Sequence, residues 1–164
     1  MRRRHFLAHL AAWGAALALP RAWADPRPID DRIDVCPYCG MKVIDARFAA
    51  QVETEGGRTL TYDAIECLLD HAAGHGPPPP DVADAWLADR VASSRDDATW
   101  LAVDAAVLLH HPRLRTPMGG GLAAFADADA AAAFADANRL DGARTLTWEA
   151  ARQEADGRPW VPPW

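Results

Sequence analysis

One short sequence occurs twice in this chain, and that repetition limits the fold more than any other feature. RTLTYDA at residues 58–64 returns as RTLTWEA at 144–150, with an aromatic residue replacing an aromatic and an acid replacing an acid. Two copies indicate a duplicated unit, whereas a solenoid needs at least three repeats to bury a continuous core. We therefore expect two similar halves packed as one compact unit within the 164 residues.

The residues around the first copy predict two strands followed by a helix. Segment 41–53 alternates roughly between apolar and polar residues, and a Gly-Gly turn separates it from a second short strand at 58–62. A helix is expected within 63–76, where Asp63 is placed to cap the first turn with Glu66 three residues later. This order of elements is a β-β-α unit.

Four consecutive prolines predict a linker at 77–81, because proline can neither continue a helix nor sit in a central strand. The linker separates an N-terminal half, 25–76, from a C-terminal half, 82–155, which a tail at 156–164 follows. The second half is strand-rich up to a helix predicted at 128–139. The predicted fold class is therefore α+β, with two similar β-β-α halves.

The first 24 residues have the anatomy of a cleavable export signal, with a basic start, an apolar run and small residues before the cleavage point. The run is too short and too rich in alanine to anchor the chain in a bilayer. Arg3 and Arg4, followed by Phe6 and Leu7, resemble a twin-arginine signal, and a general secretory signal is the alternative. Either route, with cleavage after Ala24, predicts a periplasmic protein.

The charge of the mature chain excludes two classes of partner. The signal contains four arginines and no acid, so its removal leaves 13 basic against 23 acidic residues, a net charge near −10. Nucleic acids and anionic lipids attract the opposite sign, so we expect neither as a partner. No cysteine precedes Cys36 to carry a lipid at the signal boundary. We therefore expect a soluble monomer that is not lipid-anchored.

Three cysteines remain in the mature chain, Cys36, Cys39 and Cys67, and an odd number means that at least one thiol is outside any internal disulfide. The first two form CPYC, the motif with which glutaredoxins exchange disulfides. Such a pair is reactive when its first sulfur lies at a helix N-terminus. Here Gly40 and a strand-like segment follow, which disfavours a redox helix. A thiol-disulfide oxidoreductase remains an alternative.

A zinc site is a second alternative. Zn²⁺ is satisfied by four nitrogen or sulfur ligands in a tetrahedron, and Cys36, Cys39, Cys67 and His71 could supply them. Cys67 and His71 are four residues apart and so share one face of the expected helix. However, zinc gives no reason for the methionine that follows the CxxC pair. This interpretation describes a zinc-stabilised binding module.

Copper(I) does account for a methionine beside the cysteines. Cu(I) is a soft ion that prefers thiolate and thioether donors at low coordination number. On an extended segment Cys39 and Met41, two residues apart, project from the same side. Met118 is the best third sulfur, because the three glycines after it allow a loop to pack closely against another element. The residues therefore favour a Cu(I) site.

The same segments resemble those of a known family. CPYCGM at 36–41, LTYDAIECLL at 60–69 and RTPMGGGLAAF at 115–125 resemble, in order and spacing, the NosL proteins, copper chaperones that accompany nitrous oxide reductase. The resemblance implies a non-enzymatic Cu(I) carrier that hands copper to that reductase or to its maturation machinery. It implies Cys39, Met41 and Met118 as metal ligands, while Cys36 matches the first cysteine of the family.

Four further residues are weaker candidates for the metal site. Cys67 and His71 lie partly off the apolar stripe of the predicted helix, and His110 and His111 stand in the segment that leads to Met118. All these assignments depend on one condition, which is that the early cysteines and Met118 converge in space.

Overall fold

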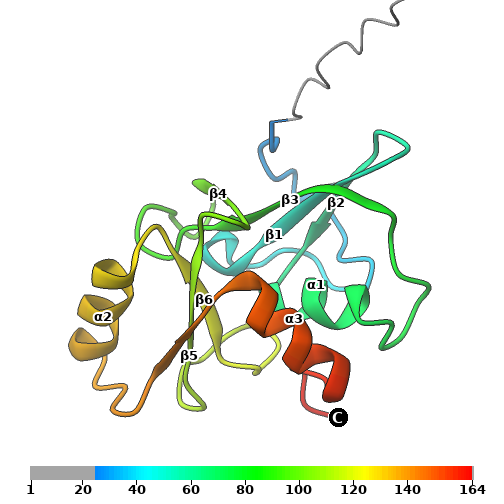
Figure 1. Cartoon of the computed structure of the whole chain (residues 1–164). Helices are drawn as coiled ribbons and strands as arrows, with labels where there is room; N and C mark the ends of the chain where they lie inside the picture. Colours follow the sequence, from blue (N-terminus) through cyan, green and yellow to red (C-terminus); the bar gives the residue numbers. More distant parts are fainter. Residues whose placement is uncertain (1–24, 164) are drawn as a thin grey trace, which may run out of the picture.

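Residues 25–163 are described here in a computed structural model, and the expected export signal at 1–24 lies outside them (Figure 1). In chain order the elements are a 3-10 helix η1 (Ala46–Phe48), β1 (Ala50–Thr54), β2 (Thr59–Tyr62), α1 (Ile65–Ala72), β3 (Val82–Ala88), β4 (Trp100–Ala102), β5 (Val107–His110), β6 (Leu122–Phe125), α2 (Ala128–Ala137), β7 (Arg144–Leu146) and α3 (Trp148–Gly157). Within the described residues no helix is both long and apolar enough to cross a membrane.

The strands form two antiparallel sheets, which confirms the predicted α+β class. The first sheet has the order β2-β1-β3-β4, with Ala50 of β1 paired to Tyr62 on one side and Leu87 on the other. The second sheet has the order β6-β5-β7. An isolated bridge between Asp89 and Ala124 brings the end of β3 beside β6. The two sheets therefore meet directly.

The boundary between the sheets does not coincide with the proline run at 77–81. β3 begins at Val82, directly after the prolines, and pairs with β1 along its length. The first sheet therefore extends to Ala102, and the chain passes to the second sheet between β4 and β5. The prolines lie in the connection that carries the chain from α1 to the edge of β1, where β3 pairs with it.

The second sheet is covered by helices on both faces, as Figure 1 shows, with α2 on one side and α3 on the other. Side chains alternate across a strand, so Leu108 of β5 joins the core under α1 and α3, whereas Leu109 joins the core under α2. Leu122 and Phe125 of β6 divide in the same way. The β6 face that carries Leu122 is the one turned toward the cysteines.

Both copies of the repeat form a strand and lead into a helix, but the helices begin at different points. After β7 the Thr147 side chain accepts a hydrogen bond from Ala150 N–H, and α3 starts at once. In the first copy the equivalent Thr61 instead accepts a hydrogen bond from Gln51. There α1 starts at Ile65, three residues after Tyr62, the residue equivalent to the first residue of α3. α3 is an element that the sequence did not lead us to expect, because no helix is predicted after residue 139.

Two local predictions are wrong. Asp63 does not cap α1, whose N-cap is Ala64 without a side-chain hydrogen bond. Segment 41–53 is not one strand, because only a single bridge at Lys42 and the helix η1 precede β1. Asp45 accepts a hydrogen bond from Arg47 N–H, and this local cap favours the helical turn over an extended chain.

Candidate metal site

A tight turn presents the first two cysteines. Gly40 N–H donates to Cys36 O at 2.9 Å, and Cys36 N–H donates to Met41 O at 2.8 Å. Gly40 closes this turn with a φ of 74°, a conformation that residues with a side chain adopt with strain. Because the turn is not the start of a helix, the expectation that no redox helix follows CPYC is confirmed. It is not extended either, so the premise that placed Met41 on the same side as Cys39 is wrong.

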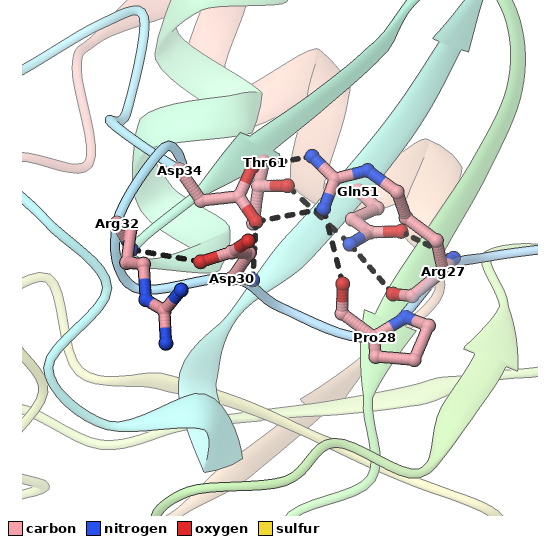
Figure 2. A network of polar contacts seen from close by, with 7 residues as sticks. All are labelled: Arg27, Pro28, Asp30, Arg32, Asp34, Gln51 and Thr61. Carbon is pink, nitrogen blue, oxygen red and sulfur yellow. Dashed lines mark hydrogen bonds and ion pairs between the residues drawn. The ribbon is translucent and has the colours of Figure 1, made fainter.

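The chain before this turn is fixed to the first sheet by a polar network, drawn in Figure 2. The guanidinium of Arg27 pairs with the buried Asp34 carboxylate, while Gln51 of β1 exchanges two hydrogen bonds with the backbone of Arg27. Burial opposes ionisation of Asp34, but hydrogen bonds from Arg27 and from Asp30 N–H hold its pKa below the ordinary value. The network holds the segment that leads into Cys36.

Four side chains from two segments form a compact cluster. The sulfurs of Cys36, Cys39 and Cys67 and a carboxylate oxygen of Asp63 all lie within 4.8 Å of one another. Cys36 and Cys39 come from the turn, Asp63 from the residues between β2 and α1, and Cys67 from the first turn of α1. Three of the four side chains are buried, and only Cys39 is partly exposed.

The environment of Cys36 favours a thiolate. The hydrogen bond from the neighbouring Cys67 thiol is the largest cause that lowers the pKa of Cys36, and hydrogen bonds from the backbone N–H groups of Cys39, Asp63 and Tyr38 act in the same direction. Together they outweigh burial and lower the pKa of Cys36 to about 5. At neutral pH the cluster therefore holds one sulfur already in the form that binds metals.

The other members of the cluster hold protons that a metal could displace. Burial, followed by the charge on Cys36, raises the pKa of Cys39 to about 11. The pKa of Cys67 is raised first by its hydrogen bond to Cys36 and then by burial. Burial and the Cys36 charge raise the pKa of Asp63 to about 7. A cation in the cluster would favour the charged form of all four groups.

The structure adds Asp63 to the candidate ligands and brings Cys67, a weaker candidate by sequence, beside the other two thiols. Asp63 is fully buried, its Oδ1 accepts from the Cys39 thiol at 4.0 Å, and its Oδ2 has no hydrogen-bond partner among the described residues. A buried carboxylate oxygen without a partner is costly unless something positive approaches it. The available signal was the spacing of four between Asp63 and Cys67, which the capping interpretation concealed.

The two methionines lie in different environments. Met118 is only 4% exposed and belongs to the same core cluster as Cys36 and Cys67, so the chain brings the distant loop into the neighbourhood of the thiols. Met41 is 39% exposed and is not part of that core. Both thioethers as ligands remain predictions, and the structure gives Met118 the more enclosed place.

The candidate histidines are engaged elsewhere. His71 Nε2 donates to Pro78 O at 2.8 Å, so its Nδ1 must accept from the Tyr62 hydroxyl at 3.0 Å. Both ring nitrogens of His111 are likewise bonded, to Asp141 O and to a backbone N–H. His110 Nδ1 accepts from the Arg144 side chain, and its ring packs on Trp160. None of the three is brought into the thiol cluster.

Cys39 opens onto a groove of about 890 Å³ between Tyr38, Pro77 and the C-terminal segment. That segment is not a free tail, because Asp70 of α1 accepts hydrogen bonds from Trp160 N–H and Val161 N–H, both at 2.8 Å. The buried sulfurs therefore lie behind Cys39, which is the member of the cluster that solvent or a partner reaches first.

Comparison with known proteins agrees with this architecture. The crystal structure of the copper chaperone NosL from Shewanella denitrificans superposes with a TM-score of 0.63 at 15% sequence identity, covering 76% of this chain and 93% of that one. At this identity the likeness establishes the fold. No curated protein matches the sequence. The family profile described as NosL matches residues 27–155, which is most of the chain. This protein therefore belongs to the NosL family.

Proposed function

We propose that this protein is a non-enzymatic Cu(I) carrier that binds one ion in the thiol cluster of Cys36, Cys39 and Cys67. The observation that carries the proposal is the convergence of three sulfurs and one carboxylate oxygen within 4.8 Å. Three thiolates suit Cu(I), a soft ion of low coordination number. The similar solved structure from Shewanella denitrificans is that of a copper chaperone, which supports the same cargo.

The depth of the cluster suits transfer of the ion from protein to protein. Cys36 and Cys67 are 1% and 0% exposed, so they would retain the ion, whereas Cys39 at the groove can be replaced by an incoming sulfur. Exchange of one ligand at a time keeps the ion coordinated throughout. Met118, in the core that Cys36 and Cys67 share, and the exposed Met41 are the proposed thioether donors, each as an alternative to a third thiolate, because Cu(I) takes few ligands.

The proposed recipient follows from the family. We place the mature protein in the periplasm and assign its copper to nitrous oxide reductase or to the machinery that matures it. The acidic mature chain would suit a basic docking surface on the recipient. Membership of the family supports a carrier, and the periplasmic location rests on the residues at 1–24.

A zinc-stabilised module is the second candidate, and Asp63 is the observation that favours it. A carboxylate oxygen beside three thiolates completes a tetrahedral set that suits Zn²⁺, whereas Cu(I) does not need the oxygen. The two candidates predict different contents after anaerobic purification. Stoichiometric zinc that a Cu(I) chelate cannot displace supports the module, and its displacement by one Cu(I) supports the carrier.

The proposal is tested by anaerobic Cu(I) titration of the reduced mature protein against a chromophoric chelator. We expect one tightly bound ion and loss of at least a hundredfold in affinity for Cys36→Ser and Cys67→Ser. Val91→Ala, at an exposed position in the turn after β3, is the control and should bind as the parent does. Unchanged binding by both cysteine variants rejects the cluster as the copper site. An insulin-reduction assay tests the oxidoreductase alternative.

A further inference from the structure

The described residues contain a buried carboxylate that the proposed copper site does not use. Glu66 stands one residue before Cys67 on α1 and is 0% exposed. Its side chain reaches from α1 to the residues that lead into β6 of the second sheet. Its Oε1 accepts from the Thr116 hydroxyl at 2.6 Å and from Leu122 N–H at 3.1 Å. These two donors stand at either end of the loop that contains Met118.

The same loop is tied to itself through Thr116. The Thr116 hydroxyl, which donates to Glu66, also accepts from Gly121 N–H at 3.2 Å, and Gly119 N–H donates to Thr116 O at 3.2 Å. Glu66, Thr116 and the start of β6 therefore close a ring of hydrogen bonds around Met118.

The loop also lies directly on the Glu66 side chain. A Cβ atom added at Gly120 would stand 2.4 Å from Glu66 Cγ and 2.8 Å from Trp160 O, closer than real Cβ atoms approach. Gly121, at a φ of 74°, passes equally close to His111 O. The glycines after Met118 were expected to let the loop pack closely against another element, and at Gly120 the loop packs against the Glu66 side chain.

We propose that Glu66 is a positioning residue, whose hydrogen bonds to Thr116 and Leu122 hold the Met118 loop against the helix that carries Cys67. The two sheets contribute different donors to the proposed site, since the thiols belong to the first unit and the thioether to the second. A link between them sets the place of the thioether relative to the thiols. This inference rests on the proposed function for its purpose, but its geometry is testable without copper.

The first experiment uses the metal-free mature protein, which contains two methionines, Met41 and Met118. With ¹³C-methyl-labelled methionine, the buried Met118 methyl should give a signal displaced from that of the exposed Met41. Thr116→Val removes only the bridging hydroxyl and should move the Met118 signal toward the exposed position, while circular dichroism stays unchanged. Glu66→Gln, which keeps an acceptor oxygen for both donors, should leave the signal in place. An unmoved signal in Thr116→Val and Glu66→Ala overturns the proposal.

The second experiment asks whether the effect on copper passes through Met118. Thr116→Val should weaken Cu(I) binding by between about tenfold and a hundredfold, which is the usual loss of affinity when a residue that orients a metal ligand is changed. In a Met118→Leu background the same change should add less than about twofold, because the thioether is already absent. Equal weakening in both backgrounds would mean that the link only stabilises the fold, and would overturn the positioning role. If Met118→Leu itself binds as the parent does, the ligand assignment fails, whereas the methyl signals still decide the role of Glu66.

Discussion

The charge state of Asp63 makes the sharpest prediction about stability. Its pKa is raised from 3.8 to about 7, first by burial and then by the negative charges of Cys36 and Glu66. In the unfolded chain the carboxyl ionises near its ordinary value, so the folded state binds the proton more tightly between these two pH values. Stability therefore falls as pH rises from about 4 to 7, and this contribution is constant above that range.

The size of the effect follows from the two pKa values. Each pKa unit corresponds to about 1.4 kcal/mol, and integration between pH 5 and pH 8 gives a loss of about 2–3 kcal/mol from Asp63 alone. Asp63→Asn keeps the shape of the side chain and does not titrate. The variant should consequently gain about 2–3 kcal/mol relative to the parent between pH 5 and pH 8.

Urea unfolding of the reduced, metal-free protein at both pH values measures this difference. Asp127→Asn is a matched control, since Asp127 caps α2 at the surface and asparagine caps helices equally well. The advantage of Asp63→Asn should persist, though reduced, in a Cys36→Ser background, because burial is the first cause of the shift. The same difference in stability at pH 5 and at pH 8 would refute the inferred titration of Asp63.

Further predictions concern metal binding and packing. Cys39, with a pKa of about 11, and Cys67 are both protonated at neutral pH, so the apparent Cu(I) affinity should rise by about two decades per pH unit between pH 6.5 and 8 in competition titrations. A pH-independent affinity would exclude these thiols as ligands. A disulfide within CPYC should abolish Cu(I) binding, and equal binding by the reduced form and by the oxidised form, verified by mass spectrometry, would contradict this. Gly120→Ala should destabilise the fold by about 1–3 kcal/mol in urea unfolding, because its Cβ meets Glu66, whereas Gly157→Ala, which meets no neighbour within 4 Å, should not.

Local sequence determined the class of fold and the geometry of the cysteine turn. Alternating apolar residues are sufficient to predict strands, and both copies of the repeat do form a strand that leads into a helix. CPYCG closes on itself because glycine at the fifth position can take a positive φ, which brings Cys36 and Cys39 together without help from distant residues. These features depend on neighbours along the chain, so local patterns can indicate them, although the extended chain expected from Cys39 to Met41 missed the turn.

The tertiary structure decided the membership of the site. Asp63 could cap a helix by its sequence, but the N-cap of α1 is Ala64, one residue later, and the Asp63 carboxylate lies among the sulfurs instead. Conversely, His71 stands four residues after Cys67, a spacing that places two metal ligands on one helical face, yet its two ring nitrogens hydrogen-bond to Tyr62 and Pro78.

The link between Glu66 and the Met118 loop spans 50 residues and two sheets, so no local pattern could reveal it. Spacing along the chain determines which residues can face one another within a helix or a turn. Which of them then meet a buried charge, a carbonyl or another sulfur depends on how the sheets pack, because buried polar groups take the partners that packing brings within reach.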